Sequence, residues 1–332
     1  MKTYAEERNV MNQSRKCLVG SMIGEKIMFI SPLLKWYVKH GIRVTKICQV
    51  VEYTPVQCFR KLGEQISDTR RAGDTDPNKT ILGETNKLTG NSMHGTTATN
   101  KEKHRKIAFC YENNVSRCVK DPFFRQCNQL NDTTFEVEMS KKTITLDLPL
   151  HIACFVYQYA NLCMLEFYYD LMDTFIDRRD FQYCCMDTDS AYMGLSADSL
   201  EEVIKPELKH RYQSEKHNWF PRSDAPEHAS YDKRTPGLFK EEYRGDGIVA
   251  LCSKAYYCFG VEDKFSCKGI NKRLNNINTN TYMDVLLTTR SGNGTNRGLR
   301  SVDNTVCAYL QERAGSSYCY SKRKVSTAPL DI

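Results

Sequence analysis

The chain has 332 residues, of which 40% are hydrophobic and 26% are charged, and its formal net charge is +7. This composition is typical of a folded globular protein with about two or three lobes, and it excludes a disordered basic tail. The moderate positive excess permits a polyanionic partner without requiring one.

Cysteine usage and the N-terminal sequence indicate the compartment. The chain has 15 cysteines but no Cys-x-x-Cys pair, so the common zinc-binding spacings are missing. We interpret the cysteines as reduced thiols of an intracellular protein. The opening sequence, MKTYAEERNV, lacks the apolar core of a signal peptide, and charges and a proline interrupt the apolar stretch over 18–38. We therefore expect no membrane partner.

The first half of the chain is expected to mix helices with short strands. Its predicted elements are a helix over 18–40, a strand over 44–53, a segment over 65–78 that ends in the turn-rich sequence GDTDPN, and a helix from 79 to 94 that ends at Gly95. A polar interval over 96–149 follows and closes with a hairpin over 135–149. Basic residues gather at 101–106 within the polar interval.

The second half is expected to contain the longest helix, over 151–178, which leads directly into a hairpin over 181–195. The further predictions are a charged helix over 199–216, two strands around the Arg-Gly-Asp-Gly turn at 244–247, a loop at 291–298 and a basic C-terminal region.

The hairpin over 181–195 carries the sharpest chemical signal. Two apolar runs flank Asp187-Thr188-Asp189-Ser190, which is a turn sequence. Carboxylates that converge at such a turn repel each other, and a hard divalent cation relieves that repulsion. Asp187 and Asp189 are therefore candidate ligands of Mg²⁺. The alternative is that both are solvated turn residues, because Asp is common in turns for local hydrogen bonding alone.

The predicted helix over 79–94 carries a second polar group. Lys87 and Asn91 are four residues apart and share a helix face, which His94 continues. A lysine, an amide and a ring suit the phosphate, sugar and base of a nucleotide. The alternative is an ordinary solvent-facing stripe, which the spacing alone favours.

Downstream, Lys254 and Tyr256 share a strand face and could contact a phosphate and a sugar, although a half-buried tyrosine beside an extended lysine is a commoner arrangement. Further positive charge follows at Lys268, Lys272 and Arg273.

Three motifs follow one another along the chain: Lys-x-x-x-Asn-Ser-x-x-Gly, then Asp-Thr-Asp-Ser, then Lys-x-Tyr. In this order they resemble the motifs of family B DNA polymerases. The chain is most similar to the protein-primed branch, in particular to the polymerases of Maverick/Polinton transposons. Residues 81–95 resemble the fingers helix, 183–190 the metal-binding hairpin and 253–256 the Lys-x-Tyr motif, and the resemblance extends from about residue 17 to the end.

The resemblance implies a DNA polymerase that adds dNTPs to a primer 3′ end by a two-metal mechanism, with Mg²⁺ or Mn²⁺ as cofactor. Its partners would be a DNA primer–template, dNTPs and a terminal priming protein, and its location nuclear. Asp187 and Asp189 would bind metal and be catalytic. The nucleotide would contact Lys87, Asn91, His94 and Gly95, and the DNA would contact Lys254, Tyr256, Lys268, Lys272 and Arg273.

The implied fold is α/β (α+β), with a right-hand polymerase architecture: a partial palm with an antiparallel sheet, helical fingers and a basic thumb. The corresponding intervals are an N-terminal helix and strand over 1–64, fingers over 65–95, a polar insertion over 96–150, the palm with the metal-site hairpin over 151–262 and a thumb over 263–332.

The chain departs from the family pattern in three places. His94 stands where relatives have Tyr, and Met186 where many have Gly. The family's Asp…Ser-Leu-Tyr-Pro motif, which supplies another metal-binding carboxylate, does not occur between Met1 and Lys87, and no exonuclease domain precedes it. We therefore expect a C-terminal polymerase fragment. Two alternatives are a catalytically incomplete remnant that binds DNA or dNTP without chemistry, and a single structural cation at Asp187 and Asp189.

Overall fold

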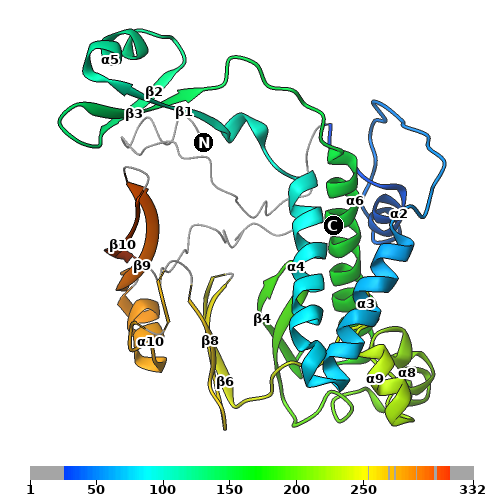
Figure 1. Cartoon of the computed structure of the whole chain (residues 1–332). Coiled ribbons are helices and arrows are strands. Elements are labelled where there is room, and N and C mark those ends of the chain that lie inside the picture. Colours follow the sequence, from blue (N-terminus) through cyan, green and yellow to red (C-terminus); the bar gives the residue numbers. More distant parts are fainter. Residues whose placement is uncertain are drawn as a thin grey trace.

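The computed structural model describes residues 26–252, 254–267, 270–272, 274–288, 290–302 and 305–314 (Figure 1). Over these residues the protein is a mixed α/β fold with small antiparallel sheets, in the strand orders β1-β3-β2, β4-β5, β6-β7-β8 and β9-β10. The described residues include no helix that is both long and apolar enough to cross a membrane.

The helices are α2 (Ser31–Lys39), α3 (Arg60–Thr75), α4 (Thr80–Thr97), α5 (Glu112–Val119), α6 (Leu150–Leu165), the π-helical η3 (Glu166–Met172), α7 (Asp173–Phe175), α8 (Lys209–Glu215), α9 (Pro226–Asp232) and α10 (Thr279–Thr288), with short 3₁₀ turns η1 (Pro77–Lys79), η2 (Lys101–Lys103), η4 (Pro206–Leu208) and η5 (Lys216–Asn218). The strands are β1 (Arg105–Tyr111), β2 (Phe124–Gln129), β3 (Thr134–Ser140), β4 (Phe181–Asp187), β5 (Ser190–Leu195), β6 (Gly247–Cys252), β7 (Ala255–Phe259), β8 (Lys264–Ser266), β9 (Asn293–Val302) and β10 (Thr305–Ala314).

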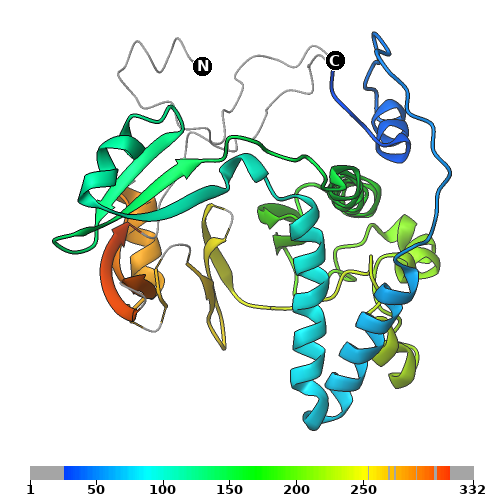
Figure 2. The same cartoon turned by 45° about the horizontal axis from the view of Figure 1, so that its top comes forward.

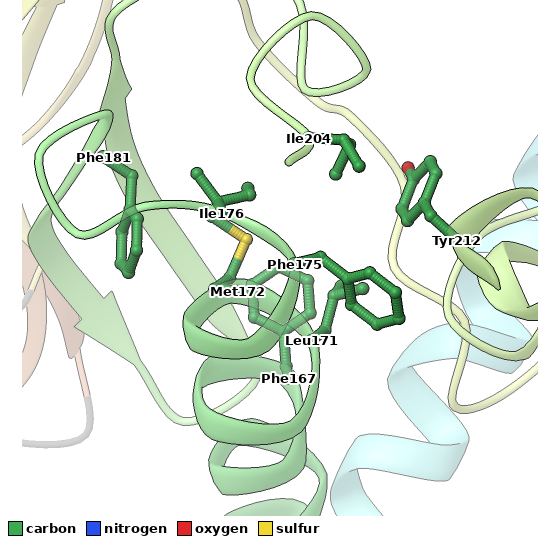
Figure 3. Close-up of a cluster of buried hydrophobic side chains, with 8 residues drawn as sticks. All are labelled: Phe167, Leu171, Met172, Phe175, Ile176, Phe181, Ile204 and Tyr212. Atoms are coloured by element: carbon green, nitrogen blue, oxygen red, sulfur yellow. The ribbon is translucent and has the colours of Figure 1, made fainter. Parts of the chain in front are cut away.

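The principal core forms around the long helical run α6–η3–α7. Phe167, Leu171, Met172 and Phe175 project from its C-terminal part and are almost fully buried. They meet β4 and the segment that follows the hairpin (Figure 3), and the whole buried cluster is Phe167, Leu171, Met172, Phe175, Ile176, Phe181, Ile204 and Tyr212. Burial of each such side chain contributes about 1.5–3 kcal/mol. This core holds the base of the β4–β5 hairpin.

The α3–α4 helical hairpin lies beside this core. Gly83 and Gly90 of α4 face α3, and the Ile66 side chain of α3 packs over Gly90. Figure 1 shows α4 beside α6, with which it is in contact, whereas Figure 2 shows α6 end-on and α4 along its length, so the two helix axes cross. The β4–β5 hairpin lies between α4 and the β6–β7–β8 sheet (Figure 1). The chain thus brings a polar helix to one side of the acidic hairpin and a second hairpin to its other side.

Several sequence-based predictions are confirmed. The helix over 79–94 is α4, the long helix over 151–178 is α6–η3–α7, and the hairpin over 181–195 is β4–β5. The first predicted helix is shortened to α2 within the described residues. Gly95 is not a helix terminator, because α4 continues to Thr97 and the Thr97 hydroxyl donates to the His94 carbonyl.

Other predictions are wrong because strand pairing depends on distant residues. The segment 44–53 has no regular secondary structure, and apolar side chains such as Val50 are largely exposed. The hairpin expected over 135–149 does not form, since β3 pairs with β1 and β2 instead. The strands expected around 244–247 are β6 and β7, which both follow that turn, and most of the loop expected at 291–298 lies in β9. The charged helix is reduced to α8 with its flanking 3₁₀ turns.

Candidate functional site: an acidic hairpin tip

Asp187 and Asp189 lie at the tip of the β4–β5 hairpin. Asp187 pairs with Ser190 across the strands, so Thr188 and Asp189 form a two-residue loop. Thr188 has φ of 50°, in the left-handed region that β-branched residues avoid. Such a conformation costs on the order of 1–3 kcal/mol and persists only where the surrounding structure enforces it. The turn therefore holds the two carboxylates in a sharply bent segment of backbone.

A β-bulge in β4 decides which way Asp187 faces. The pairing shifts between Tyr183 and Cys185, so Cys184 is an extra residue. Up to the bulge, Phe181 and Tyr183 pair with Leu195 and Met193 on the core face. Beyond it, Cys185 pairs with Tyr192 and Asp187 with Ser190 on the opposite face, because directly paired residues share a face. A regular strand would have placed Asp187 on the same face as Phe181.

Three contacts join this outer face to the β6–β7 hairpin. The Lys254 ammonium lies 3.2 Å from Asp187 Oδ2. The Tyr192 hydroxyl donates a 2.5 Å hydrogen bond to the Tyr256 hydroxyl, and the Cys185 thiol lies 4.0 Å from the Cys252 carbonyl oxygen. The two hairpins are therefore joined from the middle of their strands to their tips.

The tyrosine pair is partly enclosed. The Tyr192 and Tyr256 ring centroids are 4.5 Å apart. Burial, and then the hydrogen bond from Tyr192 to Tyr256, raise the pKa of the Tyr192 hydroxyl. Tyr192 therefore stays protonated at neutral pH, and its hydroxyl group connects the two hairpins.

Lys254 stands at the tip of its own hairpin, with φ of 64°. Its side chain is 62% exposed, whereas that of Asp187 is 29% exposed. Two hairpin tips, each with a residue in the left-handed region, thus meet through one ion pair. The ammonium supplies positive charge at the carboxylate where the sequence predicts a metal ion.

The oxygen donors at this tip fit a hard cation. Mg²⁺ is commonly bound by one or two carboxylates that leave its other positions to water and substrate phosphates. Asp187 and the exposed Asp189 provide such a pair. Across the residues that the structure describes, no three His, Cys, Asp or Glu side chains converge into a metal site.

The candidate nucleotide-binding residues lie on α4. Lys87 is partly exposed, with its ammonium 3.7 Å from Glu84 Oε2, and Asn91 is exposed one turn further on. His94 packs its ring edge-on against Tyr157 of α6, at a centroid distance of 4.8 Å, and its Nδ1 is buried without a hydrogen-bond partner. His94 therefore belongs to the α4–α6 contact, while Lys87 and Asn91 remain accessible. Gly95 lies inside α4.

The downstream basic residues are only partly described. The Lys272 ammonium donates to the Phe265 carbonyl and lies 4.9 Å from the centroid of the Phe265 ring. Lys268 and Arg273 lie outside the described residues.

Sequence reasoning missed Tyr192 and Cys184. Tyr192 lies two residues after Ser190 and therefore on the same strand face, which could have identified it as a neighbour of the acidic tip. Nothing in the sequence marks Cys184 as a bulge, because Cys184-Cys185 reads as part of a continuous apolar run.

Comparisons with protein-family models, with curated proteins and with solved structures found no match to this chain.

Proposed function

We propose that the chain is a template-directed DNA polymerase of the family B type, with a partial palm, helical fingers and a basic thumb. The observation that carries the proposal is the meeting of Asp187 and Lys254 at two hairpin tips. These residues belong to two sequence motifs that are far apart in the chain, and both motifs occur in the order that such polymerases use. The neighbouring α4, with Lys87 and Asn91, supports the same function.

In this proposal Asp187 and Asp189 hold Mg²⁺, or Mn²⁺ in its place. When bound, the metal would make a primer 3′ oxygen more nucleophilic and neutralise charge on the phosphates. Lys87 binds the triphosphate by charge, and Asn91 donates a hydrogen bond to the sugar or base. Lys254 and Tyr256 hold the primer strand beside the carboxylates.

Primer extension by the purified chain tests this function. Asp187→Asn keeps the shape of the side chain but removes the charge that a divalent cation needs. We expect extension in Mg²⁺ or Mn²⁺ to fall at least about 100-fold, since metal stabilisation of the transition state contributes several kcal/mol. Asp198→Asn, at an exposed carboxylate beyond β5, is the matched control and should extend like the parent chain. Equal extension by the Asp187→Asn variant would refute the proposal.

A second function, DNA or dNTP binding without chemistry, is favoured by one observation: Asp187 is engaged by a lysine, and among the residues that the structure describes no third acidic or other metal-binding side chain converges there. A fluorescent primer–template distinguishes the two functions. Binding that weakens with added salt, as counterion release requires, together with no extension by the parent chain, would support the binding function and exclude the polymerase.

A further inference from the structure

The ion pair at the hairpin tips has a consequence for any cation that binds there. A divalent ion that takes Asp187 as a ligand needs the oxygen that the Lys254 ammonium now approaches to 3.2 Å. Two cations at one carboxylate oxygen repel each other strongly, because the interaction of charges grows as their separation falls. Lys254 and a divalent ion therefore exclude one another at Asp187 unless the ammonium moves.

The backbone keeps Lys254 close to the carboxylate. The Tyr192–Tyr256 hydrogen bond and the contact between Cys185 and Cys252 hold the two hairpins side by side. Lys254 projects from a hairpin tip, so its position follows that of β6–β7. The effective concentration of the ammonium at Asp187 is therefore set by the fold.

The side chain can nevertheless leave. Lys254 is 62% exposed, and its four-carbon stem is flexible. An ion pair this open is weak, so an anion of higher charge density, such as a phosphate, can draw the ammonium away. The same residue can thus sit on Asp187 in one state and on a phosphate in another.

We propose that Lys254 is an internal competitor of the divalent cation, and that phosphate binding releases Asp187 for metal. This rests on the proposed function, because it takes Asp187 as a metal ligand. Metal and phosphate then bind with positive coupling: each favours the state in which Lys254 has left the carboxylate. The free chain would hold metal weakly, and its metal affinity would rise once a phosphate draws Lys254 away from Asp187.

Mn²⁺ binding followed by electron paramagnetic resonance, without DNA or nucleotide, tests this inference. We expect Lys254→Gln to lower the Mn²⁺ dissociation constant by roughly threefold to fivefold, which corresponds to the strength of an exposed ion pair. Lys254→Arg keeps the charge and should bind Mn²⁺ as weakly as the parent chain. Lys264→Gln, which removes a partly exposed lysine 3.7 Å from Glu242, measures the effect of net charge alone.

A primer–template duplex provides the second arm, after correction for Mn²⁺ bound by the duplex itself. Its addition should raise the Mn²⁺ affinity of the parent chain toward that of the Lys254→Gln variant and leave the variant unchanged. If Lys254→Gln binds Mn²⁺ no better than Lys264→Gln, the competition is overturned, while loss of binding in Asp187→Asn would still support the proposed function. If Asp187→Asn retains the same Mn²⁺ affinity, both the inference and the proposed metal site are overturned.

Discussion

Asp232, at the C-terminal end of α9, is a buried carboxylate with 6% of its surface exposed. It accepts three hydrogen bonds from Arg222: 3.0 Å from the backbone N–H, 2.7 Å from Nε and 3.0 Å from Nη2. These bonds stabilise the charged form and lower the pKa of Asp232 to about 2. The carboxylate is therefore ionised in the folded protein at neutral pH.

This residue makes the stability of the fold depend on pH. An aspartate in the unfolded chain has a pKa near 3.9, so as the pH falls from about 4 to 2 the unfolded state takes up a proton that the folded state does not. The stabilisation from Asp232 is complete above pH 4 and is lost over that window. We expect Asp232→Asn to lower the free energy of unfolding at pH 7 by about 2 kcal/mol and to flatten its decline below pH 4. Urea denaturation at several pH values measures both effects.

Asp224→Asn is the control for this comparison. Asp224 is an exposed carboxylate just before α9, and it pairs with His228 in the first turn of that helix. Its removal should change the free energy of unfolding at pH 7 far less than Asp232→Asn does. Equal effects of the two substitutions would mean that enclosure by Arg222 does not stabilise Asp232.

At the scale of elements, the sequence predicted the helices and hairpins whose formation depends on local pattern. The α4 helix and the β4–β5 hairpin follow from periodicity and turn residues. The segment 44–53 alternates like a strand, but no described strand pairs with it, so the alternation alone did not make this segment a strand.

For the candidate site, the sequence identified Asp187 and Lys254 separately. Their 3.2 Å separation depends on packing between two hairpins, which no local pattern encodes.

The β4 bulge leads to a counterintuitive prediction about the same hairpin. Because Cys184 is the extra residue, its deletion leaves the pairs Tyr183–Met193 and Cys185–Tyr192 in place, and Asp187 keeps its face. Deletion of Met186 instead shifts Asp187 relative to Cys185 by one residue and turns it to the core face. A carbodiimide, which condenses a carboxylate with a neighbouring amine, reports this orientation through an Asp187–Lys254 cross-link.

We expect peptide mass spectrometry to find that cross-link in the parent chain and in the Cys184 deletion, and not in the Met186 deletion. Asp187→Asn in the parent chain identifies the carboxylate that reacts. If the Cys184 deletion loses the cross-link while its circular dichroism spectrum is retained, β4 is a regular strand and the bulge does not orient Asp187.

At the scale of the whole molecule, the α3–α4 hairpin is attached at two places. His94 of α4 packs against Tyr157 of α6. On the other side, Asp74 of α3 accepts hydrogen bonds of 2.7 Å and 2.5 Å from Arg234, just beyond α9, and both side chains are mostly buried. The Arg71 guanidinium lies 3.8 Å from the centroid of the Tyr231 ring. The position of Lys87 relative to the acidic tip therefore depends on contacts made far from either.

Loss of the Asp74–Arg234 pair should loosen this hairpin without disturbing the β4–β5 tip. We expect Asp74→Asn to cost about 1–2 kcal/mol, because it leaves the partly enclosed Arg234 without its charged partner. Hydrogen exchange should accelerate over residues 60–97 and remain unchanged over 181–195, whose core contacts come from α6–η3–α7. Asp68→Asn, which removes an exposed partner of Arg71 on the same helix, should leave exchange at both places near that of the parent chain. Faster exchange over 181–195 in the Asp74→Asn variant would mean that the two hairpins unfold as one unit. In that case α4 could not move independently of the β4–β5 hairpin.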